Sequence, residues 1–234
     1  MSSSQPIAVI TGASSGIGES IAYKLSEYNY HIVIIARSIN KLSLIKEKIK
    51  TECTAIKADL SNPKEIKRVV SKIENPQNIE VLVNNAGIGI FNKVQDTSLK
   101  DWDSQINTNL RAPFLITKAF LPYMINKNMG KIIFINSVAG LNPYPFGSAY
   151  VASKYGMRGF SSTLREEVRQ NNIKVISIHP GAVDTPLWDK SDSDFNRKDM
   201  LNVKDVSEMI IQTILAPNNL VCEEITLRRT KGDF

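Results

Sequence analysis

The residues best suited to chemistry in this 234-residue sequence are Tyr150 and Lys154, which lie four positions apart. If the stretch from 148 to 156 is helical, the two side chains stand one turn apart on the same face. A free tyrosine hydroxyl has a pKa of about 10 and transfers few protons at neutral pH. A neighbouring ammonium favours the phenolate and lowers that pKa, toward the range in which proton transfer is efficient. The pair predicts acid–base chemistry, although the same spacing also occurs on ordinary solvated helix faces.

A glycine-rich turn near the N-terminus is the second motif with chemical meaning. Three glycines are spaced Gly-x-x-x-Gly-x-Gly, after a strand-like run and before a helix-like one. Glycines let the backbone turn tightly and approach a pyrophosphate, whose charge then lies at the N-terminus of a helix. This setting predicts a dinucleotide site rather than a glycine-rich turn that binds nothing. The expected contact residues are Gly12, Ser14, Ser15, Gly16, Ile17 and Gly18.

The end of the second predicted strand indicates which dinucleotide is bound. Sites selective for NAD place a carboxylate there for the ribose 2′-hydroxyl, whereas an arginine accommodates the 2′-phosphate of NADP. Here the strand ends in Ala36, Arg37 and Ser38, with no carboxylate. Because the planar guanidinium of Arg37 suits a phosphate, the sequence predicts NADP(H). The alternative is an arginine that only caps or solvates the loop.

Open parallel sheets bind ligands at the carboxyl ends of their strands, and several further residues occupy such positions here. The end of the third strand is expected to hold the edge of the adenine. The alternative is that its aspartate only begins the following helix. The end of the fourth is expected to form a wall of the cofactor cleft or an Asx-type turn. The end of the sixth is expected to contact nicotinamide. The residues concerned are Asp59, Leu60, Asn85, Ala86, Gly87, Pro180, Gly181, Val183 and Thr185.

Two more polar residues are candidates for the catalytic cleft. Asn109 lies inside an apolar helical pattern, where an asparagine costs helix propensity and so is expected to have a partner, either water or backbone. Ser137 follows the fifth strand thirteen positions before Tyr150 and can reach the same cleft. Taken alone, Ser137 would be interpreted as a loop or cap hydroxyl. His179, inside the sixth strand, is interpreted as a packed residue rather than a catalyst.

Short apolar runs alternate with longer helical patterns along the whole chain. Continuous apolar runs are typical of strands covered on both faces, and the alternation predicts an α/β, doubly wound parallel sheet of the Rossmann type in one domain, residues 1–234. The predicted strands are Ile7–Ile10, His31–Ala36, Cys53–Ala58, Ile79–Val83, Lys131–Asn136, Ile173–His179 and Leu220–Thr226. The predicted helices are Ile17–Tyr28, Ile39–Thr51, Pro63–Glu74, Leu99–Asn126, Ser148–Gln170 and Val203–Leu215.

Composition excludes several other classes of protein. The formal net charge is +6, but the densest basic run, from Lys41 to Lys50, alternates with Leu and Ile at helical spacing. It predicts a solvated helix face and no nucleic-acid partner. No apolar run approaches bilayer length, and the first residues lack a signal-peptide pattern. Cys53 and Cys222 form neither a disulfide framework nor a metal site. We therefore expect a cytoplasmic protein without a metal or a membrane segment.

Together, these motifs resemble the short-chain dehydrogenase/reductase family, including its carbonyl and hydroxy-acid reductases. The resemblance covers nearly the whole chain, because the glycine loop, the strand ends, Asn109, Ser137, Tyr150 and Lys154 occur in family order and spacing. It implies that Tyr150 is the general acid/base, and that Lys154 lowers its pKa and holds the nicotinamide ribose. It also implies that Ser137 polarises the substrate carbonyl, and that Asn109 supports a water-linked proton relay toward Lys154.

The resemblance implies an NADP(H)-dependent oxidoreductase that transfers a hydride between the cofactor and a carbonyl or alcohol substrate. Ser15 stands where many NADP-dependent relatives carry a basic residue, so the preference for NADP(H) depends on Arg37. One alternative is a catalytically silent NADP(H)-binding sensor or scaffold. Another is an epimerase or dehydratase of the related extended fold, whose chains are usually longer.

The substrate and the assembly are less determined by the sequence. Segments 91–94, 141–146 and 187–197 are expected to shape the substrate pocket, and the polar stretch 189–199 suits a mobile lid or an inert surface loop. Their mixed character is compatible with a hydroxy acid, an acyl thioester, a pterin ketone or a sugar. A homodimer or homotetramer is expected, with the small residues Ala149, Ala152, Ser153 and Gly156 allowing close approach of a neighbouring subunit.

Overall fold

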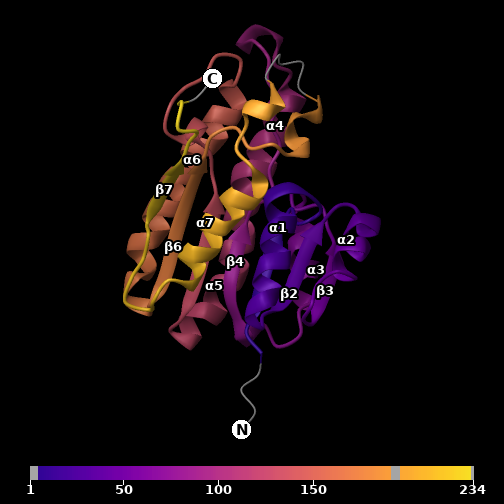
Figure 1. Ribbon diagram of the computed structural model, residues 1–234, viewed down its shortest axis with the longest axis vertical. Helices are drawn as coiled ribbons and strands as arrows, with labels where there is room; N and C mark the ends of the chain where they lie inside the picture. The colour runs from indigo at the N-terminus through magenta and orange to yellow at the C-terminus, as the bar shows by residue number, and fades with distance from the viewer. Residues whose placement is uncertain (1–4, 191–195, 233–234) are drawn as a thin grey trace.

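One wholly parallel sheet of seven strands organises the computed structural model, which describes residues 5–190 and 196–232 (Figure 1). The strand order is β3-β2-β1-β4-β5-β6-β7, so the chain builds outward from β1 in one direction and then resumes on its other side. This order confirms the predicted doubly wound fold. The strands are β1 (Ile7–Thr11), β2 (His31–Ala36), β3 (Cys53–Lys57), β4 (Ile79–Asn84), β5 (Gly130–Ile135), β6 (Ile173–Pro180) and β7 (Glu224–Leu227).

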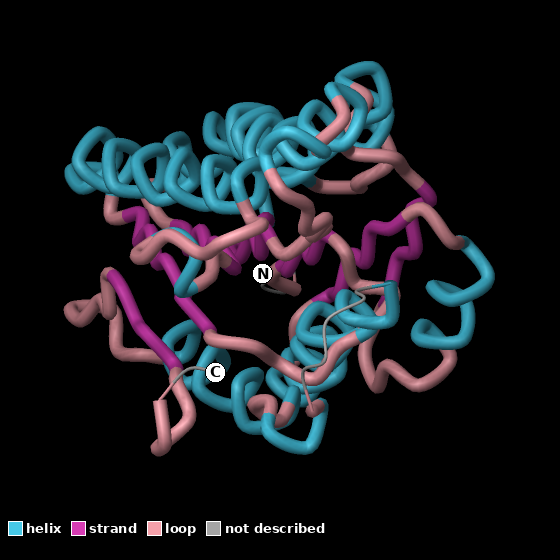
Figure 2. Tube along the Cα trace, turned by 90° about the horizontal axis from the view of Figure 1, so that it is seen from above, coloured by secondary structure: helices cyan, strands magenta, loops and turns pink. Residues whose placement is uncertain are grey.

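Helices cover both faces of the sheet, and Figure 2 shows the resulting three layers. One face packs on α1, α2 and α7, and the other on α3, α5 and α6. The helices are α1 (Gly16–Leu25), α2 (Ile39–Lys46), α3 (Pro63–Ser71), α4 (Leu99–Ile106), α5 (Ala112–Lys127), α6 (Ser148–Val168) and α7 (Val203–Leu215). Two predicted helices are longer than the observed α1 and α6 because their last residues lie in the 3₁₀ turns Ser26–Tyr28 and Arg169–Asn171.

The continuous apolar runs of the strands follow from this layering. All five residues of β1 are buried, and successive side chains point to opposite faces. Ala8 and Ile10 therefore join the core under α1 and α7, while Ile7 and Val9 join the core under α5. A strand with water on one face would have needed alternating polar residues.

The long helix predicted over 99–126 is interrupted. The structure contains α4, a π-helical turn at Asn107–Arg111, and then α5. Pro113 explains the break, because it has no amide hydrogen to donate to the carbonyl of Asn109 four residues earlier. The wider turn places the side chain of Asn109 in the interior, where it is fully buried.

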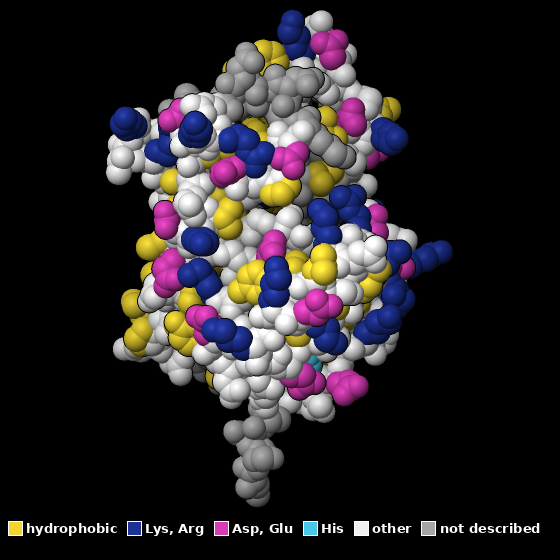
Figure 3. Space-filling model, turned by 45° about the vertical axis from the view of Figure 1, so that its right-hand side comes forward, with side chains coloured by type: hydrophobic (Ala, Val, Ile, Leu, Met, Phe, Trp, Pro, Cys, Tyr) yellow, Lys and Arg dark blue, Asp and Glu magenta, His cyan; other side chains and the backbone are white. Residues whose placement is uncertain are grey.

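The surface at residues 41–50 has the solvated helix face that the sequence predicts. On α2 and the turn after it, Leu42, Ile45 and Ile49 are buried while Lys41 to Lys50 present their charged ends to solvent, as expected of a solvated helix face. Basic and acidic side chains are interspersed over the face drawn in Figure 3. No helix within residues 5–190 or 196–232 has the length and apolar character that a bilayer span requires.

Candidate active site

The glycine loop between β1 and α1 has the geometry that its spacing predicts. Gly12 and Gly16 have φ angles of +64° and +61°, in the left-handed region that glycine adopts most easily. A Cβ on Gly12 would lie 2.7 Å from the Cα of Ala86, so the loop and the end of β4 touch through backbone. Ser15 is the N-cap of α1 but makes no capping hydrogen bond with its side chain. The first amides of α1 are thus not covered by that hydroxyl, which suits an anion.

Asn85 holds this loop in place. Its side-chain amide donates to the carbonyl oxygens of Thr11 at 2.9 Å and Gly12 at 3.1 Å. The Thr11 hydroxyl donates to the carbonyl of Val83 at 3.1 Å and accepts from the amides of Asn85 and Ala86. Sequence reasoning gave Thr11 no role of its own, although a hydroxyl on the last residue of a buried strand was the available signal. The Asn85 side chain therefore positions the cofactor loop from behind.

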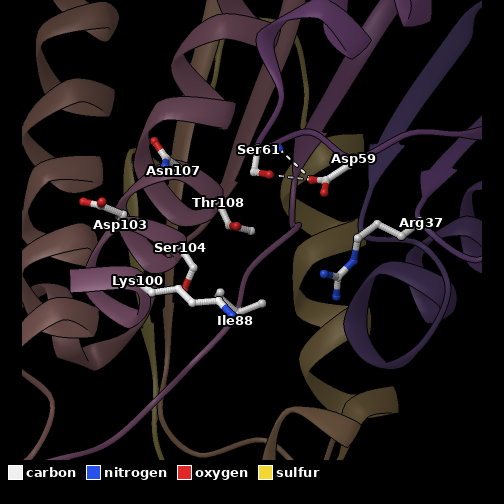
Figure 4. Close-up of a pocket in the computed structure, with 9 residues that line it drawn as sticks. All are labelled: Arg37, Asp59, Ser61, Ile88, Lys100, Asp103, Ser104, Asn107 and Thr108. Atoms are coloured by element: carbon white, nitrogen blue, oxygen red, sulfur yellow. Dashed lines mark hydrogen bonds between the residues drawn. The ribbon is translucent and has the colours of Figure 1, made fainter. Parts of the chain in front are cut away.

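A cavity of about 660 Å³ lies beside the end of β2, between Arg37 and Asp59 on one side and α4 on the other (Figure 4). Arg37 is exposed and lines this cavity. Asp59 also lines it, while one of its oxygens accepts from the amide and hydroxyl of Ser61 at 3.0 and 2.7 Å. The side chain of Leu60 packs in the core and is only 7% exposed, so the predicted contact with the adenine would have to come from its backbone.

Tyr150 and Ser137 meet at the carboxyl end of β5. Tyr150 lies in the first turn of α6, and its hydroxyl forms a hydrogen bond with the side chain of Ser137. Ser137 is held in turn by the amide of Ala139, which donates to its oxygen at 3.1 Å. The structure therefore brings these two side chains together, as the sequence predicted.

Lys154 lies one turn after Tyr150, with its amine 5.6 Å from the centroid of the Tyr150 ring. The side chain is buried, and the amine donates to the carbonyl of Ile135 at 2.9 Å. Burial lowers the pKa of Lys154 to about 7. Burial also raises the pKa of Tyr150, and the hydrogen bond from Ser137 opposes this rise only in part. The lowered tyrosine pKa expected from the sequence is thus wrong for the protein alone, because desolvation outweighs the effect of the neighbours.

The Asn109 amide has backbone and side-chain partners in the structure. Its nitrogen donates to the carbonyl of Ile88 at 2.8 Å and to the Ser153 hydroxyl at 3.1 Å, and its oxygen accepts from the amide of Ile88 at 2.8 Å. These bonds fix the loop after β4 against α6. A Cβ on Gly87 would lie 3.4 Å from the Asn109 oxygen and 4.0 Å from the Lys154 amine, so this glycine keeps the space near both groups open.

Most of the small residues of α6 pack within the chain itself. Ala149 and Ser153 are buried, and a Cβ on Gly156 would lie 2.7 Å from a methyl group of Leu110. This face packs against the π-helical turn of the same chain. Less of this face is open to a neighbouring subunit than the sequence suggests, although Ala152 is partly exposed. Its contact with a neighbouring subunit stays a prediction.

The segment after β6 crosses back toward the glycine loop. A Cβ on Gly16 would lie 3.0 Å from the methyl group of Thr185, so the two predicted cofactor segments are in contact. Gly181 donates to the carbonyl of Leu227, and Pro180 pairs with β7 in the sheet. The side chain of Val183 is buried in the core, where it supports this segment.

Exposed Arg197 holds the same segment in place through hydrogen bonds, and the sequence analysis did not identify this role. Its guanidinium donates to Asp184, Asp189 and the carbonyl of Thr185. The predicted lid at 189–199 lies partly outside the described residues, since 191–195 are not among them. His179 is buried, as predicted, and its Nδ1 lies 3.1 Å from the carbonyl oxygen of Ser137.

Comparison with known proteins shows which family the chain belongs to. The model of the short chain dehydrogenase family matches residues 6–196. The protein belongs to the short-chain dehydrogenase family. A sepiapterin reductase from Chlorobaculum tepidum is 36% identical to this short-chain dehydrogenase over 97% of the chain and 98% of its own length.

Solved structures of the family superimpose closely on this short-chain dehydrogenase. A metagenomic short-chain oxidoreductase in complex with NADP is 32% identical, with a TM-score of 0.83 over 96% of this chain and 97% of that one. An alcohol dehydrogenase from Thermococcus sibiricus, complexed with 5-hydroxy-NADP, is 27% identical, with a TM-score of 0.88 over the same shares. A closed form of serine dehydrogenase complexed with NADP⁺ is 26% identical, with a TM-score of 0.89 over 97% and 96%. The seven-stranded fold is thus that of the family.

Proposed function

We propose that this short-chain dehydrogenase is an NADP(H)-dependent carbonyl reductase or alcohol dehydrogenase. The observation that carries the proposal is the hydrogen bond between Tyr150 and Ser137, one helical turn from the buried amine of Lys154. The glycine loop fits a dinucleotide, since Gly12 and Gly16 adopt positive φ angles and present no Cβ. NADP in the related solved structures, and a reductase among the curated relatives, support the same assignment.

In the reductive direction, bound NADPH supplies the hydride. Tyr150 donates its hydroxyl proton to the substrate oxygen as negative charge develops there, and the alcohol is released. Ser137 donates a hydrogen bond to the same oxygen, which orients the carbonyl and stabilises that charge. The raised pKa of Tyr150 suits the first role, because the residue stays protonated until the substrate oxygen becomes basic.

Lys154 restores the proton that Tyr150 gives up. Its pKa of about 7 means that the amine both holds and releases protons near neutral pH. Asn109 stands next in the proposed relay, because Pro113 supplies no amide hydrogen to its carbonyl and Gly87 leaves space between Asn109 and Lys154. In the protonated form, Lys154 also favours transient negative charge on the phenol oxygen.

Arg37 selects NADP(H) over NAD(H) in this proposal. It lines the cavity beside the end of β2, where the ribose of a dinucleotide on the glycine loop would lie. A phosphate on that ribose would form charge-assisted hydrogen bonds with the guanidinium, whereas a hydroxyl gains much less.

Substitution of Tyr150 by phenylalanine tests the function. The ring and its contact with Phe91 remain, but the proton donor is lost, so kcat should fall by roughly 10²- to 10⁴-fold. The assay is NADPH oxidation with a panel of ketones and aldehydes, with NADPH binding followed by fluorescence as the control for folding. If the protein is instead a catalytically silent binding protein, the unmodified chain will reduce none of the carbonyls. The unmodified chain and Tyr150→Phe will then bind NADPH with the same binding curve.

We also propose that the protein is a homodimer or homotetramer. Its contact surface would use the outer faces of the long helices, where Trp102 and Phe114 are exposed, rather than the small-residue face of α6. Light scattering that gave the mass of one chain would overturn this proposal.

A further inference from the structure

A short aromatic row lies beside the proposed proton donor. The rings of Phe91 and Tyr150 have centroids 5.4 Å apart and are tilted by 57°. On its other side, Phe91 stacks on Trp188, with centroids 5.8 Å apart and an interplanar angle of 2°. All three side chains are partly exposed. The hydroxyl that would meet a substrate oxygen is thus flanked by a continuous wall of aromatic rings.

The wall is held in place by backbone and not only by ring contacts. Gly89 and Gly147 make room for Phe91, since a Cβ on either one would lie within 4 Å of its ring. The next residue, Asn92, donates from its backbone amide to the carbonyl of Phe146 at 2.8 Å, which joins the Phe91 loop to the start of α6. The indole nitrogen of Trp188 donates to the carbonyl of Val183 at 3.0 Å. Loose surface aromatics would lack such supports.

One cation near this wall, Arg197, is paired with carboxylates of the same chain. Arg197 contacts the segment that carries Trp188, and its guanidinium is paired with two carboxylates, Asp184 and Asp189. A carboxylate or phosphate on the substrate would have to compete with both. Arg197 is therefore a poor partner for the anionic groups of a hydroxy acid or an acyl thioester, whereas an uncharged, apolar group can use the aromatic rings themselves.

We propose that Phe91 and Trp188 select carbonyl substrates in which a planar aromatic or heteroaromatic ring lies next to the reacting carbonyl carbon. This inference rests on the proposed function, because it places the substrate by the hydroxyl of Tyr150. A flat ring gains offset or edge-to-face contacts with the wall that a puckered saturated ring of the same size cannot make. Such pairs contribute about 0.5–1.5 kcal/mol each beyond buried area, or roughly two- to tenfold in kcat/KM per ring.

The test compares two uncharged keto esters, methyl benzoylformate and methyl cyclohexylglyoxylate, which share the reacting group but carry a flat or a puckered ring. The ratio of their kcat/KM values with NADPH is measured for the unmodified chain and for Phe91→Leu and Trp188→Leu. The expected result is a preference for the flat ring that falls by roughly two- to tenfold in each variant. Tyr28→Leu, an exposed aromatic in the turn before β2, is the matched control and should leave the ratio unchanged.

A binding measurement separates failure of this inference from failure of the proposed function. The chain contains two tryptophans, so Trp102→Phe leaves Trp188 as the fluorescent reporter. In that background, combined with Tyr150→Phe and saturated with NADP⁺, methyl benzoylformate should change the Trp188 emission at lower concentration than the cyclohexyl ester. Equal ratios in all variants, or equal binding of the two esters, would overturn the inference while carbonyl reduction stood. Absence of NADPH oxidation with every carbonyl tested would overturn the proposed function. The binding preference between the two esters would still show whether Phe91 and Trp188 select a flat ring.

Discussion

Replacement of Lys154 by methionine should make the protein without cofactor more stable near neutral pH, although it removes a residue of the proposed catalytic group. The amine lies in the interior beside Tyr150, with one carbonyl, that of Ile135, as its acceptor. Burial lowers its pKa from 10.5 to about 7. The unfolded chain therefore binds this proton more tightly than the folded chain does, and folding loses free energy wherever the lysine is protonated in the unfolded state.

The size of the effect follows from the shift in pKa. One pKa unit corresponds to about 1.4 kcal/mol, so the lowered value costs folding about 4 kcal/mol at pH 7 and about 2 kcal/mol at pH 9. The pH window is the range between the two pKa values, and stability rises with pH within it. Methionine keeps the apolar stem but leaves the Ile135 carbonyl without its donor, which costs about 1–3 kcal/mol. The variant should therefore be more stable by roughly 1–3 kcal/mol at pH 7, with the difference lost by pH 9.

Urea unfolding at pH 7, 8 and 9 without cofactor measures this directly. Lys48→Met, on the exposed stretch after α2, is the control and should follow the unmodified chain at every pH. The buried His179 also has a lowered pKa, but it titrates below this window and does not disturb the comparison. If Lys154→Met is less stable than the unmodified chain at pH 7 and the two respond alike to pH, burial of the Lys154 amine does not destabilise the fold. That result would refute the prediction.

Three further substitutions test the cofactor site. Gly12→Ala should destabilise the fold by about 2–4 kcal/mol, because its Cβ would clash with the backbone of Ala86 at a positive φ angle. Gly159→Ala is the control and should be neutral or stabilising, because there is open space around Gly159. Equal unfolding midpoints for the two variants would contradict the clash. Arg37→Ala should raise the KM for NADPH roughly 10- to 100-fold and leave that for NADH nearly unchanged, and equal losses would remove Arg37 from the phosphate site. Arg197→Ala should raise the KM for NADPH several-fold, because Thr185 loses its hydrogen bond to the guanidinium. High salt should partly reproduce this rise in the unmodified chain. A KM that is unchanged in the variant, and unchanged between low and high salt in the unmodified chain, would refute the prediction.

Much of the site could be predicted because parallel strands deliver their carboxyl ends to one edge. Any residue just after a buried apolar run, such as Ser137 or Gly12, was bound to lie at that edge once the sheet was parallel. The spacing of Tyr150 and Lys154 set their relative position, because four residues make about one turn of helix. These predictions needed only local periodicity and the rule that fixes which end of the sheet binds ligands.

The pKa values and the partners of the amide groups could not be predicted in this way. Whether Lys154 lowers the pKa of Tyr150 depends on how much water both groups lose, and desolvation is a property of the packed interior. The packing of the small residues on α6 was equally inaccessible, because Gly156 meets Leu110 in the π-helical turn, which the sequence did not predict. Phe91 and Trp188, almost a hundred residues apart, stack only because the segment after β4 and the segment after β6 meet in the folded chain.

By itself, the sequence determined the strand–helix alternation, the parallel sheet and the identity of the groups at its ligand-binding edge, since these follow from short-range patterns and residue chemistry. Only the tertiary structure decided how those groups are solvated, what Asn85 and Asn109 hold in place, and which aromatic rings lie beside Tyr150. The physical reason is that hydrogen-bond partners and burial arise from contacts between distant segments, and such contacts exist only in the packed molecule.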